Sequence, residues 1–389
     1  MIKDGSGGPL AGIKVVEFSG IGPVPFCAMM LADMGATVTR IDRVTPSGLG
    51  IERETRFELA LRGRRSISLD LKKPAGLVVA RKLIAGADCL IEGFRPGVME
   101  RFGLGPDECL QRNPKLVYGR MTGYGQDGPL AQAVGHDINY LAASGVLHCI
   151  GRAGTPPLPP LNLVADLGGG AMYLAFGVAC ALIEARGSGR GQVVDAAMVD
   201  GAASLAVNLH GLRAAGIWSE RHGDNFLDSG APWYDCYETL DGRYMAVGAI
   251  EGKFYQAFLA ALGVETAGLP KQYDRSGWPV LRQAFAEAFR TKTRAEWTEI
   301  MGRGDTCCTP VLSLEEAAAH PHSTQRNAYT TIDEVTQPMP APRFSRTASH
   351  IPVAPVKTGH DTNDILEELG FDRAEIELLQ KDGAAIQAS

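Results

Sequence analysis

Acid or base side chains that could move protons stand in three segments of the sequence. His136 and Asp137 are adjacent in the run Gly-His-Asp-Ile-Asn-Tyr at 135–140, Asp166 lies between apolar residues and three glycines, and Glu251 directly follows the apolar residues 249–250. Histidine titrates near neutral pH, and burial raises the pKa of a carboxyl group, so these side chains suit acid–base catalysis. Each also has a structural interpretation: a hydrogen-bonded His–Asp pair, an aspartate N-cap and an exposed loop acid.

A dinucleotide-binding turn is not present where a nucleotide-binding sheet would carry it. The expected pattern is GxGxxG between the first strand and the first helix. The turn instead reads Gly-Ile-Gly-Pro-Val-Pro at 20–25, with Pro25 at the third glycine position. Proline has no amide hydrogen to offer a pyrophosphate. A nicotinamide enzyme is therefore disfavoured.

Composition and charge exclude further classes. The 389 residues carry 44 acidic and 38 basic side chains, a net charge of −6, which argues against a nucleic-acid-binding protein. A local basic cluster at Arg62, Arg64 and Arg65 could still bind an anionic small molecule. The eight cysteines show no metal-ligand spacing, which predicts reduced thiols and no metal site.

Short β-branched runs alternate with helical stretches through the first 200 residues, which predicts a parallel, doubly wound sheet. The glycine-rich start at 168 is expected to open a long buried helix that ends near 186. The expected strands are 13–18, 37–41, 66–69, 89–91, 116–118 and 192–195, with helices at 25–34 and 74–87 between them.

Beyond residue 225 the pattern changes to a smaller α+β lobe. Asp241-Gly242 lies between two strand-like runs, 234–239 and 244–249, and is typical of a hairpin turn. Asp372 and Glu375 form a capping-box pattern that opens a last helix, and the tail is expected to pack on the first lobe. The predicted organisation is a large domain of 1–200 and 340–389, a linker at 201–231, a small α+β domain at 232–322 and a return linker at 323–339.

Taken together, these segments resemble the family III CoA-transferases, and within that family the α-methylacyl-CoA racemase branch. The run at 135–140 is typical of the racemase branch, whereas the transferase branch shares the aspartate at 166 but lacks this histidine. One departure is that Glu251 is followed by Gly-Lys where the resemblance predicts Pro-Gln. The resemblance extends over 10–17, 30–36, 91–98, 190–201 and 245–251.

The resemblance implies roles for individual residues. His136 and Asp166 would be the two acid/bases, and Glu251 would hold His136. It further implies a Rossmann-like large domain and an interlocked homodimer in which Glu251 reaches the site from the partner. The CoA moiety would contact Arg43, Leu69, Asp70, Leu71, Lys72, Gly93, Phe94, Arg95, Arg101 and the backbone of the 135–140 run, including Gly135, Asp137, Ile138, Asn139 and Tyr140.

The expected reaction interconverts (2R)- and (2S)-2-methylacyl-CoA thioesters by proton transfer through an enolate, with no cofactor beyond the CoA of the substrate. Amides near Gly168–Gly170 are expected to stabilise the enolate oxygen, and Met121 and Met198 to contact the acyl chain. Two alternatives stay open: a CoA transferase with Asp166 as nucleophile, and a non-catalytic acyl-CoA-binding protein.

The sequence also gives an expectation about location. Residues 1–8 have neither an apolar signal core nor an arginine-rich pattern, and the final residues are not Ser-Lys-Leu. No apolar run approaches the length of a membrane span. The expected location is the cytoplasm.

Overall fold

The computed structural model describes residues 7–388, so the expectation about residues 1–8 lies mostly outside the described part. The chain forms two compact units. Unit 1 comprises 1–144, 161–205 and 322–389, and unit 2 comprises 145–160 and 206–321. This division differs from the domain boundaries that the sequence predicts: 145–160 join unit 2, and the predicted linkers contain helices and a hairpin rather than irregular chain.

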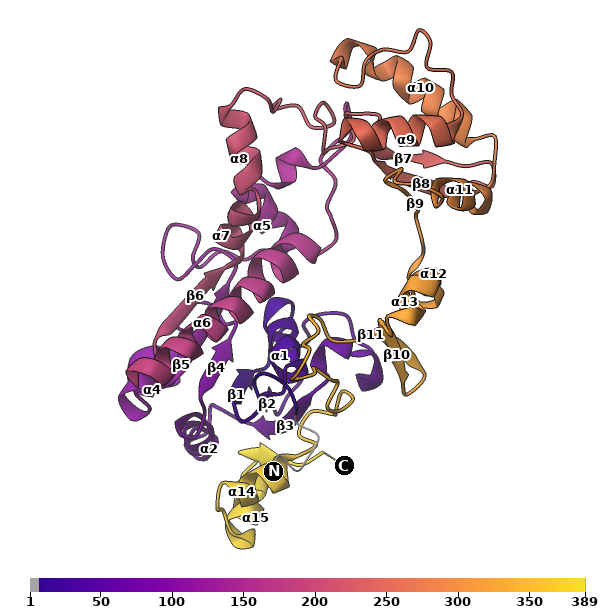
Figure 1. The fold of residues 1–389 in the computed structure, drawn as a ribbon. Helices are drawn as coiled ribbons and strands as arrows, with labels where there is room; N and C mark the ends of the chain where they lie inside the picture. The colour runs from indigo at the N-terminus through magenta and orange to yellow at the C-terminus, as the bar shows by residue number, and fades with distance from the viewer. Residues whose placement is uncertain (1–6, 389) are drawn as a thin grey trace. The chain divides into compact units, whose positions relative to one another are not determined.

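Unit 1 is built on a seven-stranded sheet in the order β12-β3-β2-β1-β4-β5-β6 (Figure 1). The neighbouring strands from β3 to β6 pair in parallel, and only β12 is antiparallel. The order reverses between β1 and β4, as in a Rossmann-like sheet, so the predicted α/β fold class is confirmed. The strands are β1 (Lys14–Phe18), β2 (Thr37–Arg43), β3 (Arg64–Leu69), β4 (Cys89–Glu92), β5 (Val117–Thr122), β6 (Val193–Ala197) and β12 (Ala385–Ile386).

The helices of unit 1 begin where the sequence offers suitable first residues. Pro74 stands in the first turn of its helix, where no amide hydrogen is needed. Asp372 caps the amide of Glu375 in the capping box that the sequence predicts. These helices are α1 (Pro23–Asp33), α2 (Pro74–Ala85), α3 (Val98–Arg101), α4 (Pro106–Arg112), α5 (Asp137–Ser144), α6 (Tyr173–Ser188), α7 (Met198–Leu205), α14 (Thr362–Glu368) and α15 (Arg373–Lys381).

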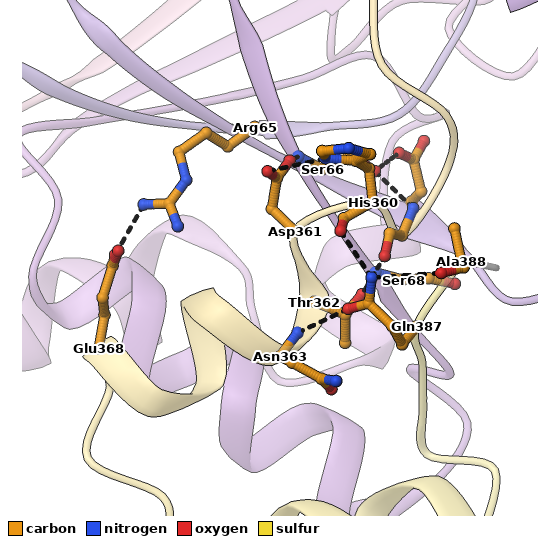
Figure 2. A network of polar contacts seen from close by, with 12 residues as sticks. Arg65, Ser66, Ser68, His360, Asp361, Thr362, Asn363, Glu368, Gln387 and Ala388 are labelled. Atoms are coloured by element: carbon orange, nitrogen blue, oxygen red, sulfur yellow. Dashed lines mark hydrogen bonds and ion pairs between the residues drawn. The ribbon is translucent and has the colours of Figure 1, made fainter.

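The C-terminal tail is hydrogen-bonded to β3, as Figure 2 shows. The Asp361 carboxylate accepts from the Ser66 amide at 2.8 Å, and the Thr362 hydroxyl accepts from the Ser68 amide at 3.2 Å. The side chain of Gln387 accepts from the Asn363 amide and donates to the His360 carbonyl. Residues of α14 and α15 join the core beneath the sheet. The tail therefore packs on the large unit, as predicted.

The basic cluster at residues 62–65 is structural, which corrects the expectation that it could bind an anion. Arg62 and Arg64 are 2% and 1% exposed. Arg62 forms an ion pair with Asp33 at 2.6 Å, and Arg64 with Glu17 at 3.0 Å. These carboxylates lie far away in sequence, so a local pattern could not reveal that the guanidinium groups are already neutralised.

The glycine-rich helix starts earlier than the sequence predicts. A π-helix, Leu163–Met172, precedes α6 and is continuous with it. Leu174 and Val178 of α6 are buried, and the helix packs on β5 and β6 (Figure 1). By length and composition the run Leu163–Ser188 could cross a membrane, with 44% of its most apolar window buried. A helix that covers a sheet passes the same test.

Unit 2 contains a three-stranded antiparallel sheet in the order β7-β8-β9. The predicted hairpin is present, and Gly242 in its turn has a φ of 68°. The helix α10 (Trp278–Phe289) buries one face through Leu281, Phe285 and Phe289, whereas its Val280 is exposed. The elements are α8 (Val207–Ala214), β7 (Tyr234–Glu238), β8 (Tyr244–Gly248), α9 (Gly252–Leu262), α10 (Trp278–Phe289), α11 (Arg294–Met301), β9 (Cys308–Pro310) and α12 (Leu314–Ala319).

Two elements follow unit 2 on the way back to the sheet. The helix α13 (Pro321–Gln325) lies at the boundary between the units. It leads into an antiparallel hairpin of β10 (Tyr329–Ile332) and β11 (Val335–Pro338), inside the predicted return linker. Gln337 at the end of this hairpin accepts a hydrogen bond from Arg62. The return segment is therefore attached to unit 1 by a buried contact.

Candidate active site

A cavity of about 520 Å³ opens in unit 1 at the carboxyl ends of the parallel strands. It is bordered by residues 21–24, which follow β1, and by 93–96, which follow β4. The strand order reverses between these two strands, and ligands of open α/β sheets bind at such a switch point. His136 and Asp166 both line this cavity.

The motif at 135–140 is held by hydrogen bonds among its own residues. The Asn139 side chain accepts from the His136 amide at 3.0 Å, and the Tyr140 hydroxyl donates to the Gly135 carbonyl. Tyr140 is buried and packs edge-on against Tyr124 with the ring centroids 5.0 Å apart. His136 itself is exposed, and its ring has no hydrogen-bond partner among residues 7–388. The motif therefore fixes the backbone of His136 and leaves the imidazole available.

Asp166 is the fourth residue of the π-helix, half-buried at the cavity. Burial raises the pKa of its carboxyl group above the ordinary value. A hydrogen bond from Asn162 at 3.4 Å and the charge of His136 oppose that rise, and the charge of Asp137 adds to it. A raised pKa makes this carboxyl group a stronger proton acceptor than an ordinary aspartate and keeps it protonated to higher pH. Asp166 is not an N-cap, so that structural interpretation does not apply.

Asp137 does not face the cavity. Its side chain is buried, and its Oδ2 accepts hydrogen bonds from the amides of Ala165 and Asp166, both at 2.8 Å. The sequence predicts a CoA contact for the backbone of this residue, and that prediction is separate from the role of its carboxylate, which caps the π-helix. The next residue, Ile138, is 43% exposed.

Four basic side chains lie exposed after successive strands. Arg43 ends β2, Lys72 follows β3, and Arg95 follows β4, with Arg101 at the end of α3. None of the four forms an ion pair with another described residue. Because the carboxyl ends of parallel strands share one edge of the sheet, Arg43, Lys72 and Arg95 border the same edge as the cavity. The Arg101 guanidinium lies near Gly97, in the turn that follows β4. We call Arg43, Lys72, Arg95 and Arg101 the basic rim.

The remaining predicted CoA contacts divide into two groups. Gly93, Phe94, Arg95, Gly135, Asn139 and Tyr140 line the cavity. Leu69 to Lys72 leave β3 outside the cavity lining, and Leu69 is a buried core residue. Arg43 lies over the Phe94 ring, with 5.8 Å between the guanidinium carbon and the ring centroid. This contact connects the rim to the cavity wall.

Met121 and Met198 are both buried and both line the cavity. Met121 belongs to β5 and Met198 opens α7. Their thioether chains are unbranched and adapt to differently shaped neighbours. The sequence predicts this pair from its neighbourhood alone.

The glycines at 168–170 do not serve as amide donors to the cavity, which corrects the expectation about the enolate. They lie inside the π-helix, whose amides bond along the helix axis. Gly169 and Gly170 are buried, and a Cβ at Gly169 would lie 2.5 Å from the Ala202 amide. These glycines allow the π-helix to approach α7 closely. At the start of α5 the Asn139 and Tyr140 amides donate to the His136 carbonyl, so the first two amides, of Asp137 and Ile138, are the ones without a helical acceptor next to His136.

Sequence reasoning missed the role of Gly22. It is the residue before α1, with a φ of 71°, and a Cβ there would lie 3.4 Å from an Asp166 carboxylate oxygen. Glycine is the residue that adopts this backbone conformation without cost. The failed dinucleotide pattern at 20–25 contained the signal: its second glycine brings the backbone close to a carboxylate instead of a phosphate.

Glu251 belongs to unit 2. It is exposed and precedes the first residue of α9, and its side chain does not cap that helix. The Gln272 side chain donates to the carbonyls of Ala249 and Ile250, and the Tyr273 hydroxyl donates to Ile250. The backbone before Glu251 is therefore well fixed, while its carboxylate stays accessible. Among residues 7–388 no group of three His, Cys, Asp or Glu side chains could hold a metal ion.

The sequence of residues 10–362 matches the model of CoA-transferase family III. The chain belongs to this family. It is similar to the α-methylacyl-CoA racemases of Mus musculus, 46% identical over 376 residues, and of Homo sapiens, 45% identical over 378 residues. Each of these alignments covers 96% of both chains.

Crystal structures of other proteins show the same fold. A CaiB/BaiF family protein from Brucella suis superposes with a TM-score of 0.81, covering 93% of this chain and all of the other. At 24% identity this likeness concerns the fold. The family resemblance predicted from the sequence motifs is thus confirmed.

Proposed function

We propose that this family III protein is an α-methylacyl-CoA racemase that interconverts the two enantiomers of 2-methylacyl-CoA thioesters. The observation that carries the proposal is that His136 and Asp166 line one cavity at the switch point of the sheet. The near full-length similarity to two racemases supports the same activity.

Inversion at the α-carbon requires a proton to leave from one face and another to arrive at the opposite face. In this proposal His136 and Asp166 serve the two faces: the basic partner removes the α-proton, and the protonated partner delivers one to the other side. The electron pair of the broken C–H bond moves onto the thioester oxygen, so the intermediate is an enolate. The first amides of α5, beside His136, are suited to donate hydrogen bonds to this oxygen.

The basic rim supplies the affinity for the nucleotide part of CoA. Arg43, Lys72, Arg95 and Arg101 lack carboxylate partners in the described chain, so their charges are free to meet phosphates. Arginine suits phosphate recognition because its planar group donates two parallel hydrogen bonds. Met121 and Met198 then contact the acyl part at the cavity wall. No further cofactor takes part in this reaction.

A homodimer and a contribution from Glu251 of the partner subunit are part of the proposal. The His136 ring has no hydrogen-bond partner among residues 7–388, and a carboxylate beside it would fix its tautomer. A candidate contact surface is an exposed stripe of α6: Met172, just before it, and Phe176, Cys180 and Ile183 at helical spacing. Exposed apolar patches of this kind often mark protein interfaces. We further propose that the protein acts in the cytoplasm.

Heavy water tests the two-base mechanism. Either pure enantiomer of a 2-methylacyl-CoA should acquire deuterium at the α-carbon and be inverted. His136→Ala should still exchange the enantiomer whose proton faces Asp166, and Asp166→Ala should exchange the opposite one. Both variants should invert their substrates far more slowly than the unaltered enzyme does. Absence of label from both enantiomers with the unaltered enzyme would reject the mechanism.

A CoA transferase with Asp166 as nucleophile is the alternative enzyme. That reaction moves CoA from a thioester to a free carboxylate: the Asp166 carboxylate attacks the thioester carbonyl, an acyl anhydride forms, and the CoA thiolate leaves and is joined to the incoming acid. The histidine in the cavity favours the racemase. Incubation with labelled carboxylic acids should therefore give no labelled thioester. A protein that only binds acyl-CoA would show neither reaction.

A further inference from the structure

The buried carboxylate of Asp137 connects the elements that carry the two proposed acid/bases. Asp137 is only 4% exposed. Its Oδ2 accepts hydrogen bonds from the amides of Ala165 and Asp166. A peptide bond joins Asp137 to His136. One residue is therefore covalently attached to the first acid/base and hydrogen-bonded to the backbone of the second.

We propose that Asp137 is a positioning residue that holds Asp166 at a fixed place relative to His136. This inference rests on the proposed racemase function. The covalent route between the two acid/bases is long, because residues 145–160 lie between α5 and the π-helix and belong to the other unit. The side chain of Asp137 connects the two segments directly through two hydrogen bonds.

The π-helix needs such a cap from outside. The first amides of a helix have no acceptor of their own, and the N-cap residue Asn162 makes no capping hydrogen bond. Its side chain donates instead to the Asp166 carboxylate. π-Helical turns are rare and are found frequently at functional sites. Asp137 satisfies two of these amides, including that of Asp166 itself.

The second carboxylate oxygen of Asp137 accepts no hydrogen bond from residues 7–388, and the charge of this carboxylate acts on Asp166. Oδ1 is buried and has no hydrogen-bond partner among the described residues. A polar atom left in this way is uncommon in a folded protein and is a cost to stability. The titratable groups that face Asp166 are His136, Asp137 and Tyr140. Of these, His136 lowers the pKa of Asp166 and Asp137 raises it.

The test compares two alanine variants within one motif by deuterium exchange of each enantiomer. Asp137→Ala removes the contact to the Asp166 backbone, and Asn139→Ala removes the contact to the His136 backbone. Displacing a catalytic group by about 1 Å can cost on the order of 10²-fold in rate. Asp137→Ala should therefore slow mainly the exchange of the enantiomer that His136→Ala still labels. Asn139→Ala should slow mainly the other.

Asp137→Asn separates position from charge. Its amide oxygen can still accept both backbone hydrogen bonds, so this variant should rescue most of the exchange lost in Asp137→Ala. It lacks the negative charge that raises the pKa of Asp166. In a His136→Ala background Asp166 is the remaining base. The double variant with Asp137→Asn should therefore reach half its maximal exchange rate at a lower pH than His136→Ala alone.

The outcomes distinguish this inference from the proposed function. Equal slowing of both enantiomers by Asp137→Ala, in a variant with unaltered circular dichroism and CoA binding, would overturn the positioning role. If that variant does not fold, an unchanged pH midpoint for Asp137→Asn would overturn the role of the charge, and inactivity of this isosteric variant would overturn the rescue. Failure of the unaltered enzyme to label either enantiomer would instead reject the two-base mechanism itself.

Discussion

Gly169 in the π-helix and Gly201 in α7 face each other with no room for a side chain between them. A Cβ on Gly201 would overlap the Gly169 carbonyl group, and a Cβ on Gly169 would lie 2.5 Å from the Ala202 amide. Both glycines are buried. The backbone that carries Asp166 is therefore packed directly against the backbone of α7.

Adding one methyl group at this contact should move Asp166 and reduce turnover. We expect Gly169→Ala to lower kcat by roughly 10²-fold, since a displacement of about 1 Å has this effect. Gly187→Ala is the matched control, because that glycine lies in α6 with no atom within 4 Å of the added Cβ. The control should keep its kcat and gain up to about 1 kcal/mol of stability. Near-native turnover of Gly169→Ala would contradict the tight contact.

The pH dependence of the reaction should be bell-shaped and the same in both directions. Each direction needs one protonated and one unprotonated partner, so full protonation or full deprotonation of His136 and Asp166 stops turnover. Burial raises the pKa of Asp166, which moves the acidic limb to higher pH than an ordinary aspartate would give. Profiles of kcat/KM for the two enantiomers would reveal limbs at different pH if this proposal is wrong.

In the His136→Ala variant, the bell-shaped pH dependence should become a single rise of the exchange rate with pH. With Asp166 as the only base, this variant exchanges the enantiomer whose α-proton faces Asp166. The rate of that α-deuterium exchange falls as the pH drops through the pKa of the Asp166 carboxyl group and is constant above it. Because burial raises this pKa, the midpoint should lie above pH 3.8, the ordinary value for aspartate. Inversion by the variant should fall by about 10²–10⁴. Near-native inversion would remove His136 from the mechanism.

Glu251→Gln should reduce kcat and leave substrate binding intact, because an amide orients the His136 ring less well than a carboxylate does. If the partner subunit supplies this group, mixing inactive His136→Ala and Glu251→Gln subunits should restore activity, since some sites in a heterodimer are intact. Tagged heterodimers can be purified and assayed against each parent. No recovery in verified heterodimers would contradict a shared site.

Removing the Arg95 side chain should weaken the binding of the nucleotide part of CoA. Hydrogen bonds to charged groups contribute about 1.5–3 kcal/mol, so Arg95→Ala should raise KM by roughly tenfold or more. The same variant should handle a truncated thioester without the nucleotide as well as the unaltered enzyme does. Arg303→Ala is a suitable control, because Arg303 lies on unit 2 in an exposed ion pair with Glu299. An equal loss with both substrates would argue against phosphate binding.

Sequence reasoning found the parts of the fold that depend on local pattern. The strands that start near residues 14, 37 and 89 are short apolar runs between turn residues, and their alternation with helices predicts the parallel sheet. The hairpin at Asp241-Gly242 and the capping box at Asp372 are equally local signals. In the site, the histidine motif and Asp166 stand out because a polar group among apolar residues and glycines is unusual.

What the sequence could not reveal depends on contacts between distant segments. Arg64 looks like a surface charge until Glu17, from another strand, is placed beside it. The glycines at 168–170 suit an amide-donating loop and a close helix contact equally well, and only the position of α7 decides between them. The assignment of residues 145–160 to unit 2 likewise depends on their partners there. Arg152, for example, pairs with Asp235 at 2.7 Å.

The antiparallel strand β12 has a consequence for biosynthesis. It pairs with β3 at one edge of the sheet, although more than three hundred residues separate the two strands in the sequence and β12 is therefore translated last. While a ribosome makes the intervening chain, β3 has an exposed edge with unpaired amides and carbonyls, and such an edge is a template for pairing with other chains. Nascent or truncated molecules that lack the tail should therefore be the aggregation-prone species, and shielding of β3 would be a task for chaperones during synthesis.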